Sequence, residues 1–200
     1  MSDSYSFDQD LREAEAMVKS LVPYIHQEPL YGSVGGLGFF MSGSMPSLTT
    51  GSLLMRIRRL NALRDQLDAD QQQRLEVIEM RNADVYSEWQ SHYDKKLVRE
   101  VHSRLDAMQT FFEECAANPR TCAQNYRPEA SRRTIVQEVL IAMENLNVPV
   151  EEDLQNKLRA VDSRLRRFVQ PDDFLWSETL KPAYDEGTFW WLYQRPPLPE

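Results

Sequence analysis

A stretch of 48 residues without glycine or proline, Asp70 to Ala117, constrains this chain more than any other feature. Glycine and proline both interrupt helices, so the stretch predicts one long helix. An apolar stripe recurs along it every 3.64 residues or so, about the 3.6 of an undistorted helix and more than the 3.5 of a coiled coil. We therefore expect a nearly straight helix buried along one side. The stripe consists of Leu75, Ile78, Asn82, Val85, Trp89, Tyr93, Leu97, Val101, Leu105, Met108, Phe112 and Cys115.

This helix is too long for a compact chain of 200 residues. At 1.5 Å per residue it would span roughly 72 Å, whereas a compact chain of this length has a diameter of about 43 Å. The weakest point is the sequence from Ser91 to Asp94, where serine and aspartate lower the helix propensity. We therefore expect an elongated molecule whose long helix is kinked or bent.

The rest of the chain also has helical periodicity, and no segment alternates convincingly as a strand does. Ser6, with Gln9 three residues later, resembles a capping box that opens a first helix near 7–22. Seven of the 20 aromatic residues lie in the last 31 residues, so we expect that end to pack on the other helices. Further helices are expected at 48–67, 129–146, 150–169 and 172–186.

Together these patterns predict an all-α protein. We expect an elongated bundle of five to six helices around one long central helix, folded as a single domain over residues 1–200. Its expected parts are a first helix (7–27), a Gly-rich uncharged loop (28–47), a helical bundle (48–169) and an aromatic-rich C-terminal segment that docks on the bundle (170–200).

Charge and hydropathy narrow the classes of partner. The chain has 23 basic and 31 acidic residues, a net charge of −8, and both of its ends are acidic. Nucleic acid is therefore an unfavourable partner, because phosphate contacts need positive potential. No run of 18 apolar residues predicts a transmembrane helix, and the start MSDSYSFDQD lacks the features of a secretory signal. We expect a soluble, cytoplasmic protein.

The two cysteines, Cys115 and Cys122, have neither the spacing of a zinc site nor that of a redox motif. In a cytoplasmic protein the default is two reduced thiols, with Cys115 packed at a helix end. A disulfide across the turn at Asn118 and Pro119 is the alternative.

Motifs for catalysis or metal binding are largely missing. Glu88 and His92 are four residues apart and could share a metal ion or a proton on one helix face, but no second pair of this kind completes a site. His26 and His102 are isolated in the sequence. We therefore expect no metal and no cofactor, and we lean against an enzyme.

The Gly-rich loop is the most unusual segment. Six of the seven glycines lie between Gly32 and Gly51, but Ser44 occupies the position where a phosphate-binding loop has lysine. No charged residue occurs within 29–55, while Phe39, Phe40 and Met41 are adjacent. Exposed loops avoid such apolar clusters. The segment therefore packs on the bundle, contacts a partner or a second copy, or, less favoured, touches a membrane.

These observations support two functional hypotheses. The first is a non-enzymatic helical scaffold or adaptor that contacts a protein partner or itself, most simply as a homodimer. The second is a small-ligand-binding protein or enzyme with a pocket between the loop and the bundle. A closed pocket that converges on His26 and Glu28 would favour the second hypothesis. The first hypothesis uses Leu37, Phe39, Phe40 and Met41, and the second uses Tyr24, His26, Glu28 and Tyr31.

Overall fold

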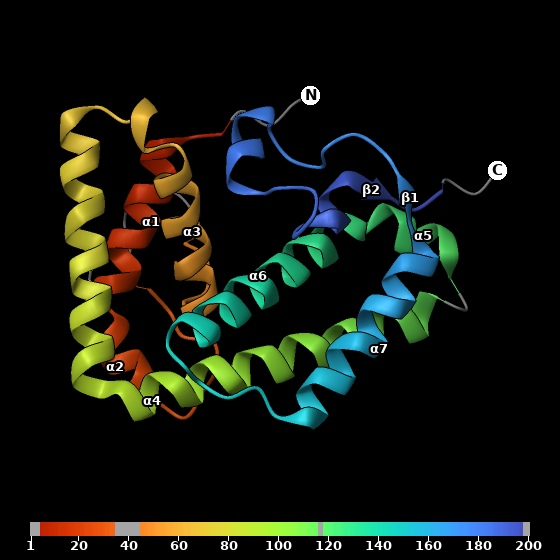
Figure 1. Cartoon of the computed structure of the whole chain (residues 1–200), viewed down its shortest axis with the longest axis horizontal. Coiled ribbons are helices and arrows are strands. Elements are labelled where there is room, and N and C mark those ends of the chain that lie inside the picture. Colours follow the sequence, from red (N-terminus) through yellow and green to blue (C-terminus); the bar gives the residue numbers. More distant parts are fainter. Residues whose placement is uncertain (1–4, 35–44, 116–117, 198–200) are drawn as a thin grey trace. The chain divides into compact units, whose positions relative to one another are not determined.

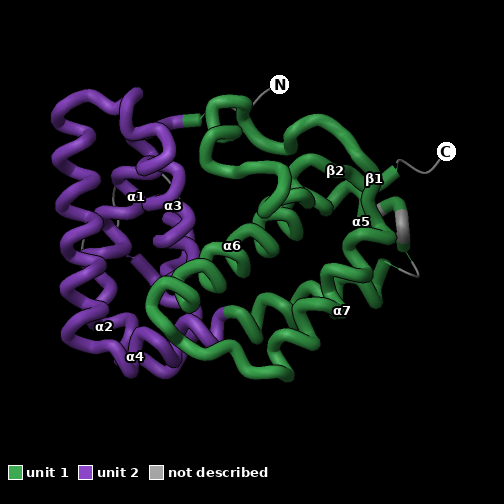
Figure 2. Tube along the Cα trace, viewed as in Figure 1, with its two compact units in different colours: residues 1–5, 101–200 green, residues 6–100 purple. Residues whose placement is uncertain are grey.

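The computed structural model describes residues 5–34, 45–115 and 118–197 (Figure 1). The described chain is mostly helical, with only two short strands, so the prediction of an all-α fold is confirmed. The chain divides into two compact units: residues 6–100 form one, and residues 101–200 with 1–5 form the other (Figure 2). The long helix α4 (Ala69–Cys115) contributes to both units.

The unit of residues 6–100 begins with two helices, α1 (Phe7–Lys19) and α2 (Leu21–His26). Ser6 caps α1 by accepting a hydrogen bond from the backbone N–H of Gln9, as the capping box predicts. The single helix expected here is divided at Ser20. Pro23 lies in the first turn of α2, where its missing N–H removes no helical hydrogen bond, so it belongs to a second helix rather than ending the first.

The second helix of the sequence prediction is shorter in the structure. It comprises α3 (Thr50–Ala62) and a 3-10 turn, η1 (Arg64–Gln66). Thr49 is the N-cap of α3 and accepts a hydrogen bond from the N–H of Ser52 at 3.1 Å. Leu48, which was expected to start this helix, instead forms backbone hydrogen bonds with Gly32.

Apolar side chains of α1, α2, α3 and α4 form the core of this unit. Figure 1 shows α1, α3 and the first part of α4 side by side, and Arg74 of α4 forms an ion pair with Glu15 of α1 at 2.7 Å. The fully buried side chains include Leu11, Met17, Leu21, Leu53, Leu60, Leu63, Leu75 and Ile78.

The helix α4 has the predicted break. Trp89 has non-helical torsion angles (φ −126°, ψ 33°), two residues before the expected position, and α4 changes direction there (Figure 1). Tyr93 is buried, and its hydroxyl donates to Asn82 Oδ1 at 2.9 Å. This hydrogen bond joins the two sides of the kink and satisfies a hydroxyl group that water does not reach.

The other unit contains the end of α4 and three further helices, α5 (Pro119–Gln124), α6 (Tyr126–Asn145) and α7 (Glu152–Phe168). The sequence analysis missed α5. A 3-10 helix, η2 (Glu178–Ala183), lies where an α-helix was expected at 172–186, and a second one, η3 (Trp190–Tyr193), follows it. Strands β1 (Gln170–Pro171) and β2 (Gln194–Arg195) form a short antiparallel pair.

The aromatic C-terminal segment packs on α6. Trp191 is fully buried, and its indole N–H donates to Thr134 Oγ1 at 2.9 Å. The hydroxyl of Tyr126 donates to the carbonyl oxygen of Trp191 at 2.6 Å. The guanidinium of Arg133 lies 4.1 Å from the centre of the Trp191 ring and donates to both carboxylate oxygens of Asp162.

A disulfide joins Cys115 to Cys122, so the expectation of two reduced thiols is wrong. The end of α4 and the start of α5 bring the two Cα atoms to 5.5 Å, within the range of natural disulfides. The alternative, a disulfide across the turn at Asn118 and Pro119, is what the structure has. The sequence did not favour it, because α5 was not predicted.

In the part of the chain that the structure describes, every helix is too short or too polar to cross a lipid bilayer.

Candidate functional site

Four described residues hold the Gly-rich loop in place where its chain meets the helices, and we call them the loop base: Tyr24, Gly32, Leu48 and Lys96. Gly32 and Leu48 form an isolated antiparallel bridge. The N–H of Gly32 donates to Leu48 O at 2.9 Å, and the N–H of Leu48 donates to Gly32 O at 2.8 Å. The bridge therefore holds together the two ends of the segment between them.

Tyr24 supports this bridge from α2. Its ring is buried, and its hydroxyl donates to Leu30 O at 2.9 Å. A Cβ atom on residue 32 would lie 2.8 Å from Cδ2 of the Tyr24 ring, closer than side-chain carbons approach each other. Glycine at position 32 thus lets the backbone lie directly against this ring.

Lys96 of α4 holds the chain just before the bridge. Its ammonium group donates to the carbonyl oxygens of Gln27 at 2.8 Å and Pro29 at 2.7 Å, and lies 4.3 Å from the centre of the Tyr24 ring. The residue is only 2% exposed. Burial, and next the positive charge of Arg99, lowers the pKa of Lys96. Its hydrogen bonds to two carbonyl oxygens offset part of the cost of burying the charge.

Glu100 of α4 holds the chain after the bridge. Its Oε2 atom accepts a hydrogen bond at 2.8 Å from the N–H of Gly51, in the first turn of α3. Glu100 is fully buried, and a carboxylate is favourable at a helix N-terminus. Lys96 and Glu100 are one turn apart on α4, so the same short piece of helix anchors both ends of the Gly-rich loop.

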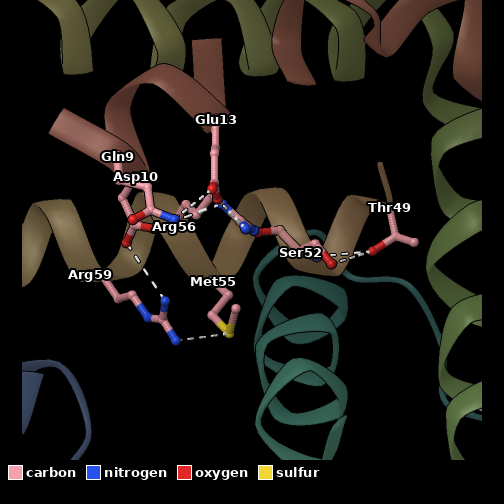
Figure 3. Close-up of polar contacts among 8 residues, drawn as sticks. All are labelled: Gln9, Asp10, Glu13, Thr49, Ser52, Met55, Arg56 and Arg59. Atoms are coloured by element: carbon pink, nitrogen blue, oxygen red, sulfur yellow. Dashed lines mark hydrogen bonds and ion pairs between the residues drawn. The ribbon is translucent and has the colours of Figure 1, made fainter. Parts of the chain in front are cut away.

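A buried ionic network joins α3, the helix that Glu100 contacts, to α1 (Figure 3). The Nε atom of Arg56 donates to Glu13 Oε2 at 2.7 Å, and its Nη1 donates to Ser52 O at 2.7 Å. Asp10 lies 3.8 Å from Arg56 and 3.7 Å from Arg59. Opposite charges are thus matched within the network, which links α1 to α3.

A surface groove of about 850 Å³ lies at the kink of α4, and its lining residues fall within 87–99. Trp89, His92 and Asp94 are among them. His26, the last residue of α2, meets this groove: its ring centre lies 4.4 Å from that of Trp89 and 4.6 Å from that of His92. Burial raises the pKa of Asp94. The groove thus combines aromatic rings with charges of both signs.

The residues of the first hypothesis, Leu37, Phe39, Phe40 and Met41, lie outside the described residues.

The residues of the second hypothesis have different surroundings. Tyr24 is buried in the loop base, and Tyr31 is 49% exposed. His26 is exposed beside the groove. Glu28 is exposed and lies 3.4 Å from Arg99. None of the four is among the residues that line the groove at the kink.

Sequence reasoning missed Lys96 and Glu100. A weak signal was present, because both flank the apolar stripe next to Leu97 and Val101, where a charge must be paired or reach solvent. It also missed the contact of His26 with His92, since the two histidines belong to different elements.

Among the described residues, no three or more His, Cys, Asp or Glu side chains are gathered so that they could hold a metal ion together.

Comparison of the chain with protein-family models, with curated proteins and with solved structures finds no match.

Proposed function

We propose that this protein is a non-enzymatic helical scaffold or adaptor that binds a protein partner through its Gly-rich loop, residues 28–47. Leu37, Phe39, Phe40 and Met41 supply the contact surface in this proposal. The observation that carries it is the double anchoring of the loop on α4, by Lys96 before the bridge and Glu100 after it. Fixed ends reduce the conformational entropy that a loop loses when it binds.

The composition of the loop favours contact with protein. It has no charged residue within 29–55 and contains two adjacent phenylalanines. Removing such side chains from water is favourable, and aromatic residues and methionine are enriched at the centres of protein interfaces. The simplest partner is a second copy of the chain, because most soluble oligomers are symmetric homo-oligomers.

Light scattering on the wild type and on the double variant Phe39→Ala/Phe40→Ala tests the proposal. We expect a dimeric wild type and a folded, monomeric variant. The matched control is Val77→Ala/Met80→Ala, which truncates two exposed apolar side chains on α4 and should leave the dimer intact. A monomeric wild type whose loop variant only melts at lower temperature would refute self-association through this surface.

The cytoplasmic location expected from the sequence belongs to the same proposal. In a cytoplasmic protein the Cys115–Cys122 disulfide would be an exception, because cytosolic thiols are usually kept reduced. Alkylation of the protein in intact cells, followed by mass spectrometry, reveals whether the two cysteines are bridged there.

Small-ligand binding is the second candidate function. The groove at the kink of α4 favours it, since Trp89 and His92 offer aromatic faces beside the charged groups of Asp94 and Arg99. If the groove binds a small ligand, Trp89→Ala should abolish that binding, whereas Phe39→Ala/Phe40→Ala should leave it unchanged.

A further inference from the structure

Two of the chain's three histidines meet at the kink of α4. The ring centre of His26, at the end of α2, lies 4.6 Å from that of His92, and the two rings are inclined at 57°. His26 also packs against Trp89, whose backbone leaves helical geometry. Both histidines are exposed, so a solute reaches them without unfolding of the chain.

The distance between the rings suits two imidazoles that share one metal ion. Metal–nitrogen bonds of about 2.0–2.1 Å at a tetrahedral angle place the two ring centres roughly 5 Å apart. The observed 4.6 Å is slightly shorter. Rotation of the two exposed side chains must make up this difference and turn one nitrogen of each ring toward the ion. The fold already brings the two imidazoles together from separate elements, so binding does not have to order them from a distance.

An ion held by these two imidazoles would have its other coordination positions open to solvent. Because no group of three potential ligands is gathered in the described part of the chain, the two imidazoles act as the protein ligands and water completes the shell. The groove at the kink adjoins His92 and leaves room for that water. Glu88 and Asp94 also line this groove and carry negative charge, whereas Lys95 and Arg99 in the same lining carry positive charge.

We propose that His26 and His92 form a binding site for a divalent transition-metal ion of the Cu²⁺, Ni²⁺ and Zn²⁺ class. Imidazole suits these ions, whereas Mg²⁺ and Ca²⁺ prefer oxygen ligands. The same site should bind Cu²⁺ more tightly than Ni²⁺ or Zn²⁺. A bound ion links the end of α2 to α4 and stabilises the fold, since it binds the native arrangement. This proposal does not depend on the proposed contact function of the loop.

Isothermal titration calorimetry with NiCl₂ tests the site on untagged protein that has first been treated with a chelator. We expect one nickel ion per chain and a higher melting temperature with nickel, and no binding of MgCl₂. His26→Gln and His92→Gln should each lower the nickel affinity at least tenfold. The matched control, His102→Gln, should leave it unchanged, and circular dichroism checks the fold of each variant.

A second measurement needs no variant. Paramagnetic Cu²⁺ at substoichiometric amounts should broaden the imidazole NMR signals of His26 and His92 before that of His102. Absence of nickel binding by the wild type, nickel binding that survives in both His26→Gln and His92→Gln, or equal broadening of all three histidines would each overturn the proposal.

Discussion

The ammonium group of Lys96 donates to two backbone carbonyl oxygens where the Gly-rich loop begins. We expect Lys96→Met to lower the free energy of unfolding by about 2–3 kcal/mol, because it leaves the oxygens of Gln27 and Pro29 without this charged donor. Urea denaturation measures the change. The exposed neighbour Lys95 provides the control, and Lys95→Met should change stability by less than about 0.5 kcal/mol. Equal losses in the two variants would contradict this role of Lys96.

Gly32 gives a second prediction for a single residue. A methyl group at this position meets the Tyr24 ring at 2.8 Å, and this ring is buried and held by its hydroxyl. We therefore expect Gly32→Ala to destabilise the protein by about 1–3 kcal/mol through overpacking. Gly187→Ala is the control, since the atom nearest its added Cβ is a carboxylate oxygen of Asp185 at 3.2 Å. The prediction fails if the two variants have the same denaturation midpoint.

Among the secondary-structure elements, α4 and α5 are linked covalently by Cys115 and Cys122. We expect Cys115→Ser/Cys122→Ser to lower the free energy of unfolding by about 2–3 kcal/mol, as chain-entropy estimates give for a loop of this length. Thermal unfolding with and without dithiothreitol measures the effect. The reductant should lower the melting temperature of the wild type and leave that of the double variant unchanged; no effect on the wild type would argue against the disulfide.

The sequence predicted an element correctly where the signal for it lies in residues that are neighbours along the chain. Ser6 and Gln9 marked the start of α1, and low propensity from Ser91 to Asp94 located the kink of α4 to within two residues. The division of α1 from α2 was missed because Pro23 is acceptable in a first helical turn. In the candidate site, the Gly-rich segment was recognisable from its composition, but Lys96 and Glu100 were not, since their partners lie far away along the chain.

For the whole molecule, each of the two units contains a buried tyrosine with a raised pKa, Tyr93 in one and Tyr126 in the other, and burial is the main cause in both. Above the unfolded value of about 10, the unfolded chain loses these protons while the folded chain keeps them. The folded state then binds more protons, so the free energy of unfolding falls as pH rises, by up to about 1.4 kcal/mol per group and pH unit.

Urea denaturation at pH 9 and pH 11 checks this prediction. Tyr126→Phe removes one titrating group, and we expect a weaker loss of stability at alkaline pH than in the wild type. Tyr86→Phe is the comparison, because Tyr86 is only partly buried. The explanation would be wrong if Tyr126→Phe lost as much stability between the two pH values as the wild type.

The bridge between Gly32 and Leu48 makes the two ends of the intervening segment neighbours in space. The protein can therefore serve as a display scaffold in which that segment is an exchangeable cassette. Doubling the length of a flexible cassette adds only about 0.6 kcal/mol to the entropy cost of closing it. Foreign peptides inserted between these two residues should thus be carried by the same helices with little loss of stability.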